Sequence, residues 1–224
     1  DDDVTGVVKL PELHAPIPAA RITQARAVAD ALGDSVHQQY PTHAGVRPMD
    51  KDNAELVLNR TWRPMLSVTG ASGLPALELA GNVLRPATTV KLSMRVPPST
   101  HVEKAGKALK EALERDPPYG ARVNFKLEKC SAGWDSPALA PWLERAMDEG
   151  SRRYFGKPAC LMGEGGSIPF MAMLGDRFPQ AQFLITGVLG PGANAHGPNE
   201  FLHLPTAQKV TCCVAHVVAE HFKR

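Results

Sequence analysis

The last part of the chain, residues 158–224, contains too few secondary-structure elements to form a domain alone. A Gly-rich turn at 163–167 leads into a helix predicted to run through Met173. An apolar strand is expected at Phe183–Ile185, and the Gly-rich loop Gly187–Asn199 joins it to a closing helix. Two helices and one strand cannot enclose a hydrophobic core, so this α/β segment needs strands from elsewhere. Because the chain also begins without Met, we expect it to be a fragment.

The preceding residues, 1–157, predict a complete module. Alternating apolar and polar residues are typical of half-buried strands, and helical spacing of apolar residues separates them. Strands are predicted at Met65–Thr69, Val90–Val96 and Arg122–Glu128, and helices at 22–32, at 102–113 after a Thr100-x-x-Glu103 capping box, and from Ser136-Pro137 to Met147. We therefore expect an α+β domain, a small antiparallel sheet with helices on one face.

Composition excludes several classes of function. Lys and Arg number 25 against 23 Asp and Glu, a net charge of +2, so the sequence favours neither nucleic acid nor an anionic membrane as a partner. No run of 18 apolar residues exists, and the first residues do not resemble a signal peptide. The four cysteines include the adjacent Cys212 and Cys213 and form no Cys-x-x-Cys motif. Reduced thiols in the cytoplasm are therefore expected.

A few polar residues are candidates for a functional site. His196 follows an expected buried strand in a Gly-rich loop, where an imidazole can bind a metal or transfer protons, although a surface histidine without function fits equally. The turn at 163–167 presents backbone N–H groups at the start of a helix, an arrangement that can bind an anion. An ordinary Gly-rich entry to a helix, without a ligand, fits the same residues. Arg95 on a polar strand face and Asn82 in a turn would each be ordinary solvent-exposed residues.

Three motifs, in order, resemble a known superfamily. Glu164-Gly165-Gly166-Ser167-Ile168-Pro169, an apolar strand, and Asn194-Ala195-His196-Gly197-Pro198-Asn199-Glu200 resemble the C-terminal end of the two-zinc exopeptidases. That superfamily includes carnosine dipeptidase, aminoacylase, glutamate carboxypeptidase and succinyl-diaminopimelate desuccinylase. Upstream, Asn82-Val83-Leu84-Arg85-Pro86 and Arg95 resemble its lid, or dimerisation, domain. The resemblance covers about residues 60–224.

The resemblance implies a role for each matching residue. His196 corresponds to the last zinc ligand, and the substrate-binding positions are Asn82, Arg95, Gly165, Gly166 and Ser167. Two zinc ions would supply a hydroxide nucleophile and polarise the amide carbonyl. An Arg fork pairs with a substrate carboxylate, and an Asn amide can donate to an oxyanion. The expected substrate is a dipeptide, a small peptide or an N-acyl amino acid, and the expected assembly is a homodimer through the lid.

Two departures from the superfamily pattern limit this expectation. Gly163 stands where the dipeptidase branch has Arg, which bears on dipeptide specificity. The His-x-Asp motif, the bridging Asp and the Glu-Glu pair, which includes the general base, belong to an N-terminal half that this sequence lacks. We therefore expect a lid domain at 1–157, the end of a catalytic domain at 158–224, no catalytic residue in this chain, and no activity from it alone.

Two other interpretations remain open. The chain could be a non-catalytic dimerisation module, or a relative that kept the fold and lost its metals. Removing half of an α/β sheet also predicts an exposed apolar patch at Phe183–Ile185 and on the helix face with Val210, Val214 and Val217.

Overall fold

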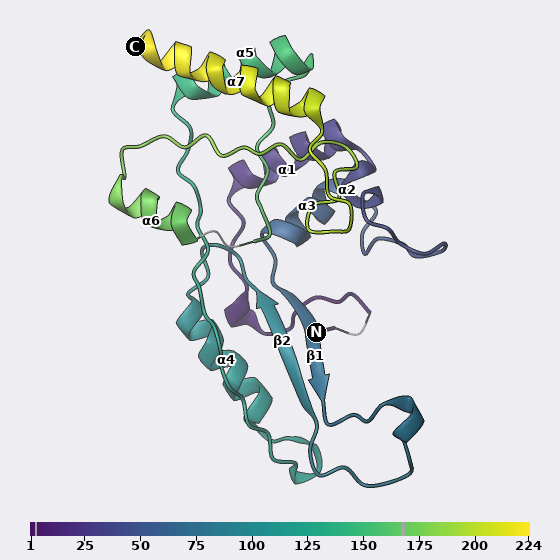
Figure 1. Cartoon of the computed structure of the whole chain (residues 1–224). Helices are drawn as coiled ribbons and strands as arrows, with labels where there is room; N and C mark the ends of the chain where they lie inside the picture. The colour runs from purple at the N-terminus through teal and green to yellow at the C-terminus, as the bar shows by residue number, and fades with distance from the viewer. Residues whose placement is uncertain (3, 167–168) are drawn as a thin grey trace.

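The computed structural model describes residues 1–2, 4–166 and 169–224, and most of its elements fall into three groups (Figure 1). The first group is helical, the second combines a two-stranded sheet with one long helix, and the third pairs two long helices. In chain order the elements are η1 (Pro11–Leu13), α1 (Ala19–Leu32), α2 (Ser35–Gln38), α3 (Asn53–Thr61), β1 (Met65–Ser72), η2 (Leu77–Leu79), β2 (Thr89–Arg95), α4 (Val102–Glu114), η3 (Pro118–Gly120), α5 (Pro141–Phe155), α6 (Pro169–Arg177) and α7 (Leu204–Phe222).

The first group packs α1 and α2 against α3 around a small apolar core. Gly33 ends α1 with a positive φ of 54°, a backbone conformation that favours glycine. Asp52 begins α3 as its N-cap, since its carboxylate accepts a hydrogen bond from the N–H of Ala54 at 2.8 Å. The core consists of Ala25, Val28, Val36, Val57, Leu58 and Trp62.

The second group contains the sheet. β1 and β2 are antiparallel, with Met65 opposite Arg95 at one end, Ser72 opposite Thr89 at the other, and an irregularity between Val68 and Gly70. A core of Val8, Leu13 and Ala105, with Met94 and Val96 packed against it, joins α4 and η1 to the sheet. This small antiparallel sheet with accompanying helices confirms the predicted α+β class, and the helices predicted near 22–32 and 102–113 correspond to α1 and α4.

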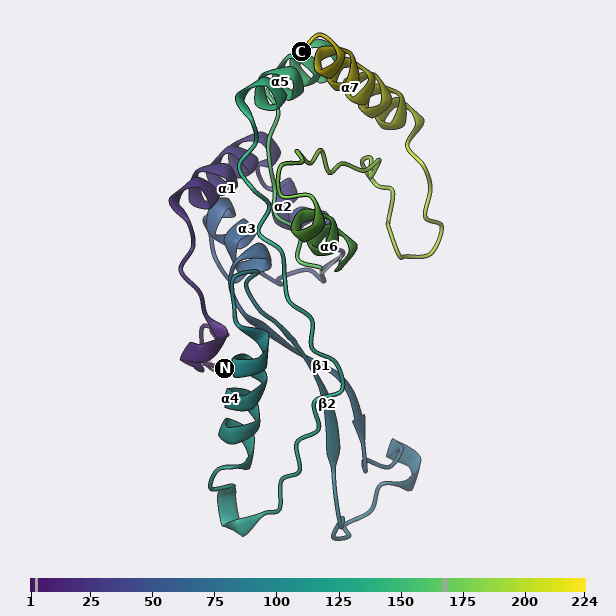
Figure 2. The same cartoon turned by 90° about the vertical axis from the view of Figure 1, so that its left-hand side faces the viewer.

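Two predicted strands are wrong. Residues 122–128 and 183–185 lie in irregular structure, without the hydrogen-bonded ladder of a strand. Residues 122–128 run beside α4 instead, where the Glu114 carboxylate accepts from the N–H of Phe125 at 2.8 Å (Figure 2). Phe183 packs its ring edge-on against Trp134, with the centroids 5.1 Å apart. Side-chain contacts therefore hold these segments where alternation alone predicts backbone pairing.

The third group pairs α5 with α7 around Leu143, Ala146 and Val217. The helix predicted from Ser136-Pro137 begins later, at Pro141, because Pro141 takes the first helical position. This pair connects the predicted module at 1–157 with the segment 158–224, and the boundary between them stays a prediction.

The predicted apolar patch is wrong at Val217, which is buried because α7 packs on α5. Val210, Val214 and Phe183 are half-buried, and Ile185 remains exposed as predicted. The patch is therefore smaller than the sequence suggests.

Among the described residues, no helix is long and apolar enough to cross a membrane. A cytoplasmic location stays a prediction.

Candidate functional site

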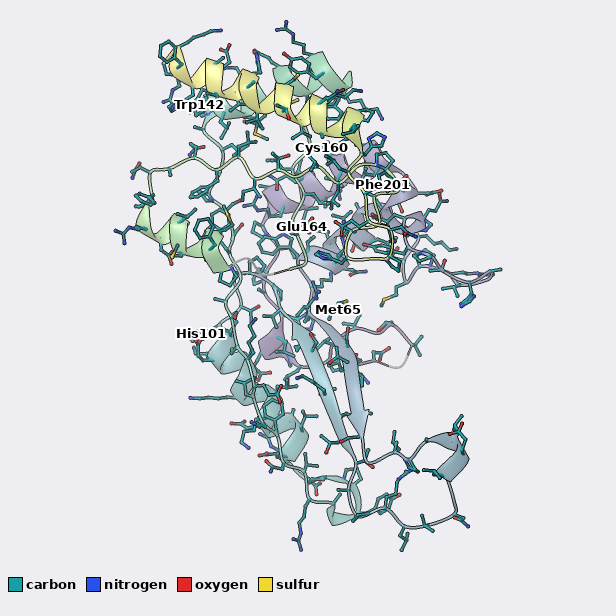
Figure 3. All side chains as sticks on the ribbon, in the orientation of Figure 1. Met65, His101, Trp142, Cys160, Glu164 and Phe201 are labelled. Atoms are coloured by element: carbon teal, nitrogen blue, oxygen red, sulfur yellow. The ribbon has the colours of Figure 1, made fainter. Side chains whose placement is uncertain are left out.

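The Gly-rich turn at residues 163–166 lies where the end of α3 meets the end of β2. In Figure 3 the turn is found at Glu164 and the sheet end at Met65, the partner of Arg95 in the ladder. The guanidinium of Arg95 donates a hydrogen bond from Nη1 to the carbonyl oxygen of Gly165, across 70 residues of sequence. The fold therefore brings two of the predicted substrate-binding positions together.

The turn fits closely because its glycines have no side chains. A Cβ added at Gly165 would lie 2.8 Å from the carbonyl oxygen of Arg60 and 3.2 Å from Nη1 of Arg95. A Cβ at Gly163 would lie 3.1 Å from Cβ of Thr61. By contrast, no described atom lies within 4 Å of a Cβ added at Gly166. The turn is therefore seated on the last two residues of α3, and Gly165 occupies its tightest position.

Arg95 is placed by the strand that ends with it. It is exposed at the end of β2, while the neighbouring Met94 and Val96 pack into the core beside α4. Among the described residues, no ion pair involves Arg95. Its remaining N–H donors are thus available for an anion, since a guanidinium carries five of them.

Asn82 lies apart from this cluster. It is exposed in the connection between β1 and β2, beyond the Ser72–Thr89 end of the sheet. Arg95 is at the opposite end of β2, and a strand of this length spans roughly 20 Å at the usual rise per residue. Within one chain, the structure therefore does not bring Asn82 to Arg95 and the turn.

His196 lies exposed in the loop before α7, with a positive φ of 61°. Its backbone N–H donates to the carboxylate of Glu200 at 3.1 Å. The loop is closed by two hydrogen bonds of Asn194. Its side-chain Nδ2 donates to the carbonyl oxygen of Pro198 at 2.7 Å, and its backbone carbonyl oxygen accepts from the N–H of Gly197 at 2.9 Å. A left-handed backbone at a non-glycine residue is uncommon and is often retained at functional positions.

A pair of metal ions does not fit the described residues of this chain alone. Among the described residues, no group of three or more His, Cys, Asp or Glu side chains could hold a metal ion. His196 therefore offers at most one ligand, whereas a zinc site needs at least three protein ligands. Ser167, also predicted to line the substrate pocket, lies outside the described residues.

A groove of about 1770 Å³ extends from this cluster along the molecule. It is lined by β2, by α4 and by the irregular segment 122–139, and it reaches Arg95, the turn at 163–166 and residues 183–187. Lys91 of β2 and Glu128 of the irregular segment form an ion pair of 2.7 Å within this lining. Because Lys91 both hydrogen-bonds and attracts the carboxylate, the pKa of Glu128 is lowered and that of Lys91 is raised.

The helix α3 and its residue Arg60 are not among the elements and site residues predicted from the sequence. The helix shows the ordinary signal, apolar residues at Ala54, Val57 and Leu58 after the N-cap Asp52, so the same spacing rule predicts it. Nothing in the local sequence, however, indicates that Arg60 contacts a turn a hundred residues later.

Comparison with known proteins finds a dipeptidase in sequence. No family model matches the chain. It is 29% identical over 171 residues to a cysteinylglycine-S-conjugate dipeptidase from Corynebacterium striatum, covering 71% of this chain and 36% of that protein.

The fold recurs in solved structures of low sequence identity. Human carnosine dipeptidase 1 matches with a TM-score of 0.71 and 17% identity, over 97% of this chain and 46% of that one. The dipeptidase Dug1p from Saccharomyces cerevisiae matches with a TM-score of 0.70 and 18% identity, over 99% and 46%. An M20 family metallo-carboxypeptidase from Sulfolobus solfataricus matches with a TM-score of 0.66 and 15% identity, over 95% and 49%.

The chain thus spans less than half the length of each of these proteins. The resemblance predicted from the three motifs is confirmed, since the four matching proteins named above are dipeptidases and an M20 family metallo-carboxypeptidase.

Proposed function

We propose that the protein containing this chain is a metal-dependent hydrolase that cleaves an amide bond in a dipeptide, a small peptide or an N-acyl amino acid. One observation carries the proposal. Arg95 and the Gly163–Gly166 turn, which lie in motifs that resemble those of the two-zinc exopeptidases, meet in the lining of a large groove although 70 residues separate Arg95 from Gly165.

Arg95 is the proposed carboxylate-binding residue. Its guanidinium is exposed and donates to the turn through one nitrogen, which leaves further N–H donors for a carboxylate. Gly165 and Gly166 would line the pocket beside it, because a backbone without side chains lets a substrate approach closely. Ser167 is proposed for the same lining by its motif alone.

The proposed cofactor is a pair of zinc ions, with His196 as one ligand. Such a pair, when bound, supplies a hydroxide nucleophile and polarises the amide carbonyl. The other ligands and the general base would come from outside the described residues, because these offer no set of three ligands. We therefore expect this chain alone to be inactive and the missing N-terminal half to complete the site.

Asn82 is proposed to act in the neighbouring subunit of a homodimer. Within one chain, Asn82 lies beyond one end of β2 and Arg95 lies at the other end, so roughly a strand length of 20 Å separates them. Asn82 therefore cannot serve the same site as Arg95 of its own chain. A dimer through the lid would let the β1–β2 connection of one subunit extend toward the groove of the other.

A non-catalytic dimerisation module is the second candidate. Exposed leucines in the β1–β2 connection favour it, notably Leu77 at 88%, Leu79 at 80% and Leu84 at 101%. Both candidates allow a dimer, so activity and metal content distinguish them.

The test compares the 224-residue chain with the full-length protein. Hydrolysis of β-alanylhistidine, an S-substituted cysteinylglycine and an N-acetyl amino acid is measured with added zinc, and zinc per chain is measured after dialysis against a weak chelator. We expect activity and two zincs from the full-length protein, and neither from the 224-residue chain. In the full-length protein, Arg95→Ala should raise KM more than it lowers kcat, whereas Arg115→Ala, which removes an exposed arginine paired with Glu111 at 3.3 Å and outside the groove lining, should leave both unchanged. A full-length protein that holds zinc but cleaves none of these amides would contradict the proposal.

A further inference from the structure

Arg60, near the end of α3, connects the Gly-rich turn to the helical group behind it. Its carbonyl oxygen and Cγ lie 2.8 Å and 3.5 Å from the position that a Cβ at Gly165 would take. Its side chain donates from Nη2 to the sulfur of Met162 at 3.2 Å, immediately before the turn. Arg60 thus lies against the turn through its backbone and holds the residue before the turn through its guanidinium.

The other arm of the same guanidinium is anchored away from the turn. Nη1 of Arg60 donates to the hydroxyl oxygen of Tyr40 at 2.7 Å. Tyr40 follows α2, and α2 packs with α1 and α3 around a common core. A planar fork that bonds two partners at once has little freedom to rotate.

The charge of Arg60 is not used in an ion pair within the described part of the chain. One of its two hydrogen bonds goes to a thioether, which is a weak acceptor. A surface ion pair therefore does not explain the position of the Arg60 side chain. Its simultaneous hydrogen bonds to Tyr40 and Met162 do.

We propose that Arg60 is a positioning residue, which holds the turn so that the carbonyl of Gly165 meets the guanidinium of Arg95. Tyr40 fixes Arg60, Arg60 fixes Met162 and Gly165, and Gly165 fixes the orientation of the Arg95 fork. The proposal rests on the proposed function only for the statement that Arg95 binds a substrate carboxylate; the mechanical coupling is independent of it.

The coupling is tested on the 224-residue chain by a double-mutant cycle read by NMR. The chain is labelled with ¹⁵N-glycine and ¹⁵N-arginine, and the signals of Gly163, Gly165 and the Arg95 side chain are followed. Tyr40→Phe removes only the phenolic oxygen that accepts from Arg60. Arg60→Met removes the fork and keeps a good helix former.

The controls separate coupling from damage to the helix. Arg63→Met removes a second arginine from the same region, whose bonds run back to Asn59 and Glu55 at 2.7 Å each. Arg60→Lys keeps the charge but replaces the planar fork with a single ammonium group. Thermal melting of each variant reports whether the fold is retained.

We expect Tyr40→Phe to shift the Gly165 and Arg95 signals, and the same substitution to add no further shift in the Arg60→Met background. Arg63→Met should leave the Gly165 and Arg95 signals at their wild-type positions. Arg60→Lys should shift them as Arg60→Met does, because the ammonium group cannot replace the planar fork. Equal, additive shifts from Tyr40→Phe in both backgrounds, or none in the wild-type background, would overturn the proposal. If Arg60→Met does not fold, the response to Tyr40→Phe alone decides.

A separate titration with N-acetylglycine distinguishes this proposal from the proposed function. Coupling without any carboxylate-dependent shift of the Arg95 signals would retain the positioning role and count against Arg95 as the substrate contact. A carboxylate-dependent shift that Tyr40→Phe leaves unchanged, with no coupling in the cycle, would retain the substrate contact and reject the role of Arg60.

Discussion

At the scale of single residues, the closest contact of the candidate site is at Gly165. Gly165→Ala would place a Cβ 2.8 Å from the backbone oxygen of Arg60, where neither atom can move without displacing the helix or the turn. We expect the free energy of unfolding in urea to fall by about 1–3 kcal/mol, as for other overpacked positions. Gly166→Ala is the matched control, since its Cβ would meet no described atom within 4 Å. Equal stability of the two variants would contradict the close packing of the turn.

The residues of the site could be predicted from the sequence more readily than their arrangement. The motifs identify Arg95 and Gly165 but do not show that the two are in contact, because the contact depends on how β2 and α3 end beside each other. His196 is equally visible in the sequence, yet its proposed ligand role needs further ligands that the described residues do not offer. Arg60 could not be predicted at all, since its proposed role depends on contacts with Tyr40, Met162 and Gly165.

At the scale of elements, the helix that supports the turn depends on its N-cap. Asp52→Ala removes the acceptor for the N–H of Ala54, and N-cap losses of this kind cost about 0.5–2 kcal/mol. We expect a lower midpoint in urea and broader NMR signals at Gly163 and Gly165, which rest on the other end of α3. Asp52→Asn retains a side-chain acceptor and serves as the control. An unchanged midpoint for Asp52→Ala would show that α1 and α2 fix α3 without the cap.

The irregular segment at 122–128 is held to α4 by a carboxylate, which predicts a pH dependence. The pKa of Glu114 is lowered below its usual value near 4.5, first by its hydrogen bond from Lys110 and then by that from the N–H of Phe125. A lowered pKa means that the contact stabilises the fold above the usual value and is lost as pH falls through the lowered one.

We therefore expect the hydrogen-exchange protection factor of the Phe125 amide to drop as the solution is acidified through that range. Glu114→Gln should remove this acid dependence. Glu111→Gln, which changes an exposed carboxylate 3.3 Å from Arg115 on the same helix, should preserve it. Protection that stays constant in the wild-type chain would mean that packing, rather than Glu114, holds the segment.

Local pattern explains which elements the sequence predicts well. Helices close their hydrogen bonds within one segment, so α1, α4 and α7 follow from spacing, and α3 is detectable by the same rule. Strands need a partner, and alternation at 122–128 and 183–185 cannot supply one. Alternation in these segments marks an apolar and a polar side, but whether they pair as strands depends on the rest of the molecule.

At the scale of the whole molecule, the proposed function accounts for the large volume of the groove. A groove of about 1770 Å³ beside a two-stranded sheet is larger than a bound dipeptide requires, since ligand pockets usually measure about 300–1,000 Å³. We attribute the excess to the part of the relatives' length that this chain does not span. This predicts stronger binding of a hydrophobic dye by the 224-residue chain than by the full-length protein, measured by fluorescence at equal molar concentration. Equal binding would show that the groove is intrinsic to the fold.

The β1–β2 connection carries a second exposed apolar cluster, at the far end of the molecule from the α5–α7 pair (Figures 1 and 2). Its leucines Leu77 and Leu84 are 88% and 101% exposed, and burying two such side chains contributes a few kcal/mol to association, at roughly 1.5–3 kcal/mol each. If the lid forms the proposed homodimer, Leu77→Lys with Leu84→Lys should convert it to a monomer in light scattering after size exclusion. Val46→Lys changes an exposed valine in the connection before α3 and should leave the dimer intact. A wild-type chain that is monomeric at high concentration, or a double variant that remains dimeric, would contradict dimerisation through this cluster and with it the action of Asn82 across subunits.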